Sequence, residues 1–303
     1  MIHIVITSFN EPKSTIRAVK TFLEQENVKD KFKIIVVDPF PEVEKALKKD
    51  IKDKRVGFFP DPGEGKSYAL NLLLEEIYSK DKNDTIIFSD GDVFVSKNAV
   101  SEIIDKFKNK KVGCVTGKPV SLDKRNSKYG LWANIAFAGI DKARKKFAKN
   151  KKFFECSGYL FAIRNGVIHG FPMETSEDSI IPYLFWKNGY YIEYADKAEV
   201  YVKNPHTWKD WLAQKVRNVK AHENLNKIAP NLPRTKSLFN EIKEGIFFAI
   251  MQARNPKEFV WITELYFARL YMYIVAFREL RKGRQYLDGW RGEAITESTK
   301  TLD

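Results

Sequence analysis

Two aspartates separated by a glycine follow a short apolar run in this chain. Asp90-Gly91-Asp92 comes directly after residues 85–89, whose apolar and partly β-branched side chains predict a buried strand. Two carboxylates at this spacing can reach one divalent cation, and the glycine between them lets ligand and backbone approach closely. Because Asp-Gly also favours turns, the pattern by itself leaves a metal site and a polar turn open.

A glycine-containing loop places a lysine where a helix is expected to begin. Gly63 and Gly65 open this loop, and Lys66 starts a predicted helix that continues to about residue 78. A helix N-terminus with a lysine beside it is a natural phosphate site. A P-loop is disfavoured because that motif needs glycine at the position of Pro60. A solvated lysine at a helix end is the alternative.

Strands and helices alternate around these motifs. Five apolar runs predict strands, at residues 2–7, 33–38, 55–59, 85–89 and 111–118. Helical patterns separate the first four of these strands from one another. This alternation is typical of an α/β protein with a doubly wound, parallel sheet. In such a sheet the acids at strand ends share one edge, where ligands bind: Glu11, Asp38, Asp90 and Asp92. Asp38 by itself could instead cap a helix.

A second group of acids opens a predicted helix in the other half of the chain. Ser176-Glu177-Asp178 stands at its start, where a serine can cap the helix and acids suit its dipole, so a structural role is one interpretation. A strand pair is predicted at 189–194 and 198–203, followed by a helix at 207–226. Gln214 and Arg217 are three residues apart and would lie on one face of that helix.

The composition is that of a globular protein with a strong positive charge. The chain has 303 residues, 44% of them hydrophobic, which is enough for one or two domains. Its net charge of +13 suits nucleic acid, an anionic membrane or a phosphorylated substrate, with a solvated lysine-rich surface as the alternative. Cys114 and Cys156 have no metal-site spacing and predict no disulfide framework. No signal-peptide pattern is present, and a cytoplasmic location is predicted.

Taken together, the ordered motifs resemble glycosyltransferase family 2, and in particular its cellulose and hyaluronan synthase branch without the transmembrane helices. The resemblance covers about residues 1–225. It implies the GT-A fold, a Rossmann-like α/β architecture with a mixed, mostly parallel sheet flanked by helices. Residues 1–120 would bind a nucleotide sugar and residues 121–230 the acceptor, whereas residues 231–303 would form an amphipathic helical extension and a tail.

The resemblance also implies a reaction. The protein would be an inverting, metal-dependent glycosyltransferase that moves a sugar from a nucleotide-sugar donor, with UDP-sugars favoured, to a hydroxyl of a saccharide or lipid-linked acceptor. Two other functions are weighed against it: a nucleotidyltransferase that forms nucleotide sugars, and a non-enzymatic nucleic-acid-binding protein. The first class favours an N-terminal glycine-rich loop, which residues 8–12 lack, and no RNA-binding or zinc motif supports the second. No nucleic-acid partner is therefore expected.

Individual site residues follow from the matches, position by position. Asp90 and Asp92 match the family's Asp-x-Asp motif and would hold Mg²⁺ or Mn²⁺, and Asp178 matches the catalytic base. The predicted donor-binding residues are Ser8, Asn10, Glu11, Asp38, Gly65, Lys66, Asn71, Asp90, Gln214 and Arg217. The predicted acceptor-binding residues are Gly158, Glu177, Trp208 and Trp211, although the two tryptophans could instead pack in a core. His206 is a candidate additional metal ligand, with a turn or capping histidine as the alternative.

The last third of the chain predicts two helices, at residues 238–252 and 259–281. The second is strongly apolar, but Glu264 and Arg269 near its middle would each cost about 3 kcal/mol at the centre of a bilayer, which disfavours a spanning helix. Basic residues beside it favour peripheral contact with an anionic membrane, at the inner face of the cell membrane: Arg278, Arg281, Lys282 and Arg284. A helix packed on the catalytic domain and an oligomer contact are the alternatives, and residues 286–303 would form the tail.

Overall fold

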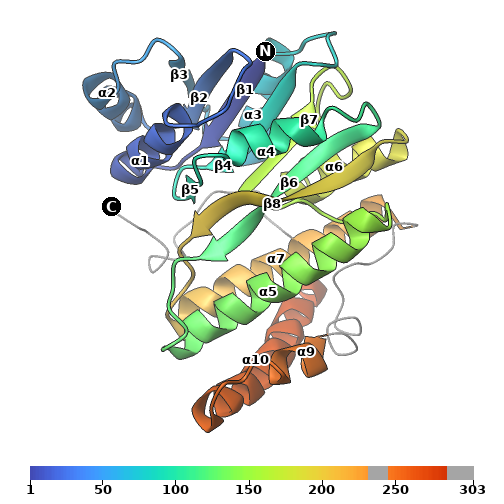
Figure 1. Ribbon diagram of the computed structural model, residues 1–303. Coiled ribbons are helices and arrows are strands. Elements are labelled where there is room, and N and C mark those ends of the chain that lie inside the picture. The colour runs from blue at the N-terminus through green and yellow to red at the C-terminus, as the bar shows by residue number, and fades with distance from the viewer. Residues whose placement is uncertain (231–244, 285–303) are drawn as a thin grey trace.

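A mixed sheet of eight strands forms the centre of the protein, which the computed structural model describes over residues 1–230 and 245–284 (Figure 1). The strand order is β3-β2-β1-β4-β7-β6-β8-β5. The strands are β1 (Ile2–Thr7), β2 (Phe32–Asp38), β3 (Val56–Pro60), β4 (Thr85–Asp90), β5 (Phe94–Val95), β6 (Val112–Ser121), β7 (Leu160–Arg164) and β8 (Tyr191–Val202). The helices are α1 (Pro12–Leu23), α2 (Pro41–Asp50), α3 (Lys66–Glu76), α4 (Ala99–Lys106), α5 (Lys128–Lys149), α6 (Glu177–Lys187), α7 (Trp208–Ile228), α9 (Ile246–Ile250) and α10 (Pro256–Arg281). The predicted mixed α/β class is confirmed.

The parallel half of the sheet aligns three strand ends. β1 pairs in parallel with both β2 and β4, so Thr7 stands opposite Val37 on one side and Asp90 on the other. β3 extends this half by pairing with β2, with Asp38 opposite Pro60. The carboxyl ends of β1, β2 and β4 therefore meet at one edge, and they carry Asp38 and Asp90 to the same level.

Helices cover both faces of this sheet. One core lies between the sheet and α1, α2 and α4, and it receives Ile4 and Ile6 of β1. The other lies between the sheet and α3 and α6, and it receives Val5. Successive residues of a strand point to opposite faces, which is why β1 contributes to both cores and reads as a continuous apolar run. The second core also contains Cys114 and Cys156, which are free thiols.

The remaining half of the sheet is partly antiparallel. β7 runs antiparallel to β4 and β6, whereas β6 pairs in parallel with β8. The predicted strand pair at 189–194 and 198–203 is wrong, because both runs belong to the single strand β8. The pairing register against β6 shifts between Gly117 and Lys118, so the residues between the two runs form a bulge and the chain does not reverse.

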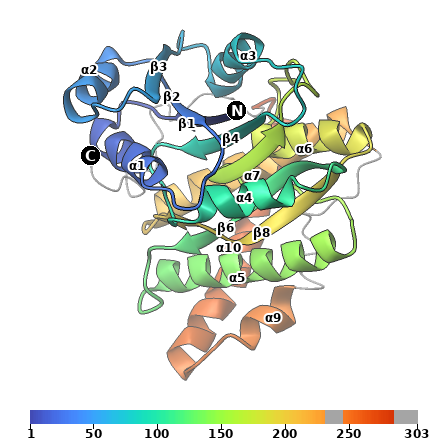
Figure 2. The same ribbon diagram turned by 45° about the horizontal axis from the view of Figure 1, so that its top comes forward.

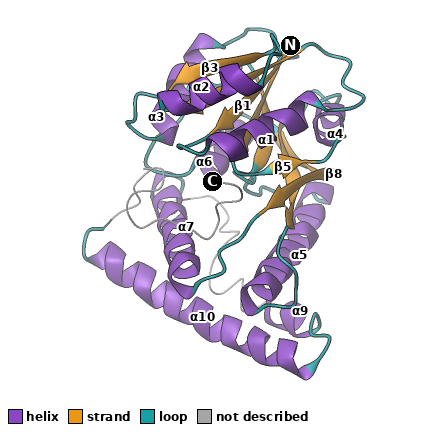
Figure 3. Ribbon diagram, turned by 90° about the vertical axis from the view of Figure 1, so that its left-hand side faces the viewer, coloured by secondary structure: helices purple, strands orange, loops and turns teal. Residues whose placement is uncertain are grey.

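The C-terminal helices lie beyond α5 and α7, on the side away from the sheet (Figures 1 and 3). α10 packs against both of these helices, and α9 lies below α5 (Figure 2). α10 begins three residues before the predicted helix at 259–281, with a capped start: Asn255 Oδ1 accepts from Glu258 N–H at 2.9 Å, and Pro256 takes the first helical position. The predicted helix at 238–252 and the predicted tail fall partly or wholly on residues 231–244 and 285–303, outside the described residues.

One face of α10 packs into the protein. Leu265 and Met272 cluster with Trp132 of α5 and Trp211 of α7, and the Trp132 indole N–H donates to the Trp261 carbonyl at 2.7 Å. By length and apolar content alone α10 could also cross a membrane, and 33% of its apolar window is buried. The predicted alternative of a core-packed helix therefore holds for one face of α10.

Candidate active site

The Asp90-Gly91-Asp92 motif leaves β4 and passes close to β1. The Gly91 N–H donates to the Thr7 carbonyl at 2.7 Å. A Cβ on Gly91 would lie 2.6 Å from the Ser8 Cβ, closer than side-chain carbons approach one another, so the position requires glycine. This close approach holds the two aspartates at the carboxyl edge of the sheet.

Asp90 and Asp92 differ in what surrounds them. The Asp90 Oδ1 accepts hydrogen bonds from the Lys66 Nζ at 2.8 Å and from the Thr7 Oγ1 at 3.2 Å. Burial, and then the charge of Asp90, raise the pKa of Asp92 to about 7, against a smaller opposing effect of Lys66. A divalent cation here would relieve the repulsion between the two carboxylates, so this pair of oxygen ligands fits Mg²⁺ or Mn²⁺.

The described residues supply only part of a metal coordination shell. Within residues 1–230 and 245–284, no group of three or more His, Cys, Asp and Glu side chains is arranged to hold a metal ion. His206, the predicted additional ligand, is exposed in the segment between β8 and α7, and nothing in the described chain joins it to the aspartates as a metal site. Magnesium sites of this kind usually complete their shell with substrate phosphates and water.

Asp38 shapes the loop that follows β1. Its side chain is fully buried and accepts hydrogen bonds from the Ser8 hydroxyl, from the Asn10 N–H at 3.0 Å and from the Phe40 N–H at 2.7 Å. Burial raises the pKa of Asp38, and these hydrogen bonds oppose the rise. Asn10 adopts the left-handed conformation with a φ of 53°, and Glu11 follows it as the buried cap residue of α1. Ser8 and Asp38, both predicted to bind the donor, thus contact each other.

Asp61 borders the same edge and was missed by the sequence analysis as a site residue. Its N–H donates to the Asp38 carbonyl at 3.2 Å, and its Oδ1 accepts from the Gly63 N–H at 2.7 Å. Burial raises the pKa of Asp61. The turn sequence Asp61-Pro62-Gly63 is the signal that could have identified it.

Lys66 connects the two halves of the site. It is the first residue of α3 and follows Gly65, whose φ of 113° suits only glycine. The Lys66 Nζ lies 2.8 Å from the Asp90 Oδ1 and 2.5 Å from the Glu177 Oε1. Burial disfavours its charge, but the two carboxylates outweigh burial and raise the pKa of Lys66 above its ordinary value. A predicted donor residue, metal residue and acceptor residue therefore meet at one ammonium group.

Asn71, a predicted donor-binding residue, also joins two segments of the site. Its Nδ2 donates to the Phe171 carbonyl and its Oδ1 accepts from the Phe171 N–H, both at 2.9 Å. These two bonds fasten the loop after β7 to α3. The sequence could not show this role, because the partner lies in a segment far along the chain.

Asp178 lies in the first turn of α6, beside the turn formed by residues 156–158. The Gly158 N–H donates to the Asp178 Oδ2 at 3.0 Å, and the Cys156 N–H donates to the Asp178 carbonyl at 3.0 Å. In the part of the chain that the structure describes, the Asp178 Oδ1 has no hydrogen-bond partner. The carboxylate is thus oriented by one oxygen and can accept a proton at the other.

Tyr159 lies between the aspartates of the two halves. Burial raises its pKa, as do the charges of Asp92, Asp90 and Asp178, and Arg217 of α7 opposes them. All four groups are therefore close enough for their charges to act on one phenol. Sequence reasoning missed Tyr159, although it directly follows the Ser157-Gly158 turn that the family resemblance points to.

A buried polar cluster supports the segment that carries Glu177 and Asp178. The Glu155 Oε2 accepts from the Ser179 Oγ at 2.6 Å and lies 3.1 Å from the His222 Nδ1 of α7. The Thr175 Oγ1 donates to the Ala221 carbonyl of α7 at 3.0 Å. Glu155 and His222 were not predicted, because nothing in their local sequence indicates that they meet.

The four predicted residues on α7 have different surroundings. Trp211 is buried, with its ring 5.2 Å from that of Trp132, so packing is the role that the structure supports for it. Trp208 stacks on Trp211 at 5.5 Å but is 41% exposed, so it can still contact a ligand. Gln214 and Arg217 lie one helical turn apart, as expected from their spacing.

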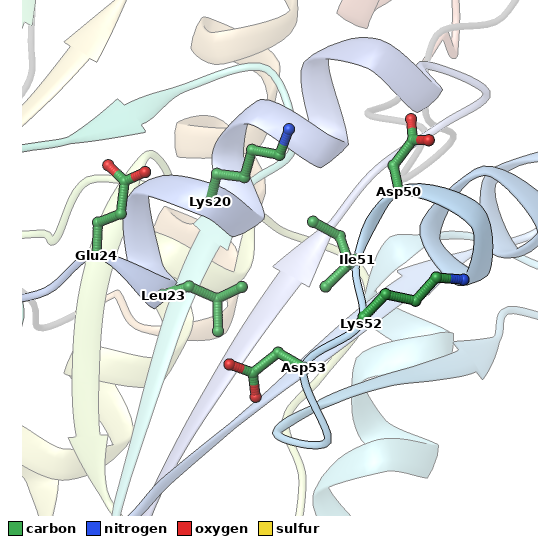
Figure 4. Close-up of a pocket in the computed structure, with 7 residues that line it drawn as sticks. All are labelled: Lys20, Leu23, Glu24, Asp50, Ile51, Lys52 and Asp53. Carbon is green, nitrogen blue, oxygen red and sulfur yellow. The ribbon is translucent and has the colours of Figure 1, made fainter.

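An open hollow lies away from this edge of the sheet (Figure 4). It is bordered by the last turns of α1 and α2 and by the segment before β3, which places it at the amino ends of the strands. The lining residues are Lys20, Leu23, Glu24, Asp50, Ile51, Lys52 and Asp53. None of the predicted site residues lines it, so the carboxyl edge of the sheet remains the candidate site.

The sheet, the flanking helices and the C-terminal helix have the architecture of GT-A glycosyltransferases. The glycosyl transferase family 2 profile matches residues 3–171, which is more than half of the chain. The chain therefore belongs to glycosyl transferase family 2, and the protein is a glycosyltransferase.

Two solved structures are similar to this chain, and the first of them supports the fold. A mannosyltransferase from Pyrobaculum calidifontis, in complex with GDP-Man and Mn²⁺, is 16% identical with a TM-score of 0.60, over 93% of this chain and 79% of that one. S. aureus TarS 1–349, in complex with UDP-GlcNAc, is 15% identical with a TM-score of 0.48, over 94% and 93% of the two chains. No curated protein sequence matches this chain. The resemblance to the cellulose and hyaluronan synthase branch stays a prediction.

Proposed function

We propose that this protein is an inverting, metal-dependent glycosyltransferase that transfers a sugar from a nucleotide sugar to a hydroxyl group. The observation that carries the proposal is the bridge made by Lys66 between Asp90 and Glu177. It brings the strand-end aspartates and the Glu177-Asp178 pair, which come from different halves of the sequence, to one place. Family membership replaces the nucleotidyltransferase and nucleic-acid-binding alternatives with a glycosyltransferase.

The donor diphosphate would lie between positive groups and the aspartate pair. Asp92, with Asp90 beside it, would hold Mg²⁺ or Mn²⁺, and the bound cation would neutralise charge on the departing diphosphate. Lys66 at the start of α3 offers a charge and a helix N-terminus to the same phosphates. Arg217 adds a second positive charge from α7, because its charge already acts on Tyr159 at the centre of the site.

Asp178 would act as the catalytic base. The acceptor hydroxyl attacks the anomeric carbon, the bond from that carbon to the diphosphate oxygen breaks, and the hydroxyl proton passes to the Asp178 carboxylate. Gly158 holds one oxygen of this carboxylate by its N–H, which orients the other oxygen. One base and one direct displacement invert the anomeric centre. Glu177, which is bound to Lys66, would position the acceptor and the loop around it.

The nucleotide and the acceptor are the least constrained parts of the proposal. UDP-sugars are favoured by the family resemblance, whereas the Pyrobaculum calidifontis structure holds GDP-Man and Mn²⁺. Trp208, exposed at the start of α7, offers an aromatic surface to a saccharide. A saccharide or a lipid-linked saccharide is the proposed acceptor class, and the proposed location is the cytoplasmic face of a membrane.

Calorimetric titration with UDP-, GDP- and dTDP-sugars, with and without Mn²⁺, tests the proposal. The wild-type protein should bind at least one donor in a metal-dependent manner. Asp92→Ala should lose this binding by about 100-fold or more while its unfolding midpoint stays near wild type, since metal-binding groups contribute several kcal/mol to phosphate recognition. Asp30→Ala, an exposed aspartate on the surface, is the matched control. Unchanged metal-dependent binding by Asp92→Ala would remove Asp92 from the site.

A further inference from the structure

The side of α10 that points away from the protein is apolar, like the side that packs. Along this outer side, large apolar residues recur at intervals of seven, three, four and three residues, with exposed fractions of 41–69%. We call them the outer stripe: Val260, Phe267, Leu270, Ile274 and Phe277. At 3.6 residues per turn this spacing makes one continuous row, opposite the row of Ile262, Leu265 and Met272 that packs inward.

The short helix α9 adds to the exposed apolar surface at this end of the molecule. The Tyr266 hydroxyl of α10 donates to the Gly245 carbonyl at 3.3 Å, which holds α9 beside the first half of α10. Phe247 is 73% exposed, more than any residue of the outer stripe, and Met251 is 69% exposed, as much as Phe267. A contiguous group of large, solvent-exposed apolar side chains usually marks a contact with another protein or with a membrane.

The acidic residues of α10 form ion pairs with the rest of the protein, whereas the basic residues at its ends do not. Each glutamate is paired with a base from another part of the protein: Glu258 with Arg125 at 2.8 Å, Glu264 with Lys128 at 3.1 Å and Glu279 with Lys220 at 2.5 Å. The exposed basic residues at the two ends of α10 make no ion pair within the described chain, and they are Lys257, Arg278, Arg281, Lys282 and Arg284. The outer side therefore presents apolar groups between positive ends, and the acids of α10 are already paired with bases of α5, α7 and the segment before α5.

This charge pattern decides between two occupants. If two copies paired along the outer stripe, either orientation of the helices would bring positive ends together, and no acid remains on that side to balance them. An anionic bilayer complements the pattern, since its headgroups attract lysine and arginine while its acyl boundary accepts the aromatic and aliphatic side chains.

The packing of α10 also decides its orientation. A spanning helix would have to leave α5 and α7, break the three ion pairs and carry Glu264 and Arg269, near its middle, into the hydrocarbon. Figure 3 shows α10 extended across the outer end of the molecule, beyond α7 and α5, so the helix can lie parallel to a flat surface. We propose that α10 lies in the plane of an anionic lipid bilayer, with the outer stripe at the acyl boundary and the basic ends on the lipid phosphates.

Vesicle sedimentation with the full-length protein tests this proposal. The protein should sediment with vesicles that contain phosphatidylglycerol at low salt, bind pure phosphatidylcholine vesicles much more weakly, and be released by high salt. The double variant Phe267→Ser/Ile274→Ser should lower the partition coefficient about tenfold or more, and Arg278→Glu/Arg281→Glu should lower it by a similar factor. Leu122→Ser/Met173→Ser removes two apolar residues outside α10 that are 43% and 45% exposed, and this variant should bind as wild type does.

Three results would overturn the proposal. One is a lack of sedimentation at low salt, and another is equal, salt-insensitive binding to both kinds of vesicle. The third is a dimer in analytical ultracentrifugation that the Phe267→Ser/Ile274→Ser variant converts to monomer, which would assign the outer stripe to a second copy. The experiment is independent of the proposed transfer reaction, because Asp178→Asn should sediment as wild type does even if it transfers no sugar.

Discussion

The proposed donor side of the active site is held by the sheet itself, whereas the proposed acceptor side is held by side chains from distant helices. On the donor side, pairing of β1 with β2 and β4 sets Asp38 and Asp90 at one level, and backbone N–H groups bind Asp38. On the acceptor side, Asp178 lies in the first turn of α6, and this turn is fixed through Ser179, Glu155 and His222. Backbone pairing tolerates most changes of side chain, but a side-chain cluster depends on each of its members.

Lys66 is the exception to this division, because it belongs to both sides. Its ammonium group joins Asp90 at the end of β4 to Glu177 at the start of α6. Because the donor side and the acceptor side are held in different ways, some variants should affect one side without the other.

The largest effect on transfer is expected for a variant of Asp178, the proposed catalytic base. Asp178→Asn keeps the shape of the side chain and an oxygen that can accept the Gly158 N–H, but it cannot take up the proton. Transfer should fall by about 10²–10⁴-fold while the donor Kd stays near wild type. Steady-state transfer assays and calorimetric donor titration measure the two quantities, with the exposed Asp196→Asn as control. If donor binding falls as far as in Asp92→Ala, Asp178 belongs to the donor side and the comparison fails.

The donor side should be most sensitive where backbone meets backbone. Gly91→Ala places a Cβ 2.6 Å from the Ser8 Cβ and 3.0 Å from the Thr15 Oγ1, and β1 cannot move away from its two partner strands. The free energy of unfolding should fall by about 1–3 kcal/mol, with weaker donor binding. Urea denaturation measures the loss. Gly245→Ala, where no described residue lies within 4 Å of the new Cβ, is the matched control and should change little.

The smallest effect on transfer is expected for a residue that supports the acceptor side. Ser179→Ala removes the hydroxyl that donates to the buried Glu155 carboxylate, and the free energy of unfolding should fall by about 1.5–3 kcal/mol. Transfer should slow several-fold with an unchanged donor Kd, because only the base is displaced. Ser101→Ala removes a hydroxyl that donates to a neutral carbonyl, that of Asn98, and should cost about 0.5–1.5 kcal/mol with no effect on transfer. A changed donor Kd in Ser179→Ala would show that the two sides are not separable.

The sequence by itself determined the features that depend on local pattern. The apolar runs of β1, β2 and β4 specify strands buried on both faces, and acids placed directly after such runs must lie at the carboxyl edge of a parallel sheet. For the same reason Asn255 and Pro256 mark the start of α10 without reference to the rest of the protein. Family motifs along residues 3–171 extended this to the glycosyltransferase class.

Only the tertiary structure decided which groups from distant segments meet. Lys66 with Glu177, Asn71 with Phe171, and Glu155 with His222 are contacts between segments far apart in the chain, and no short pattern encodes them. The inner and outer sides of α10 were equally undecided, because both are apolar and periodicity cannot say which one packs. Burial against α5 and α7 selects one side, and the ion pairs that form there draw the acids inward and leave the outer stripe between positive ends.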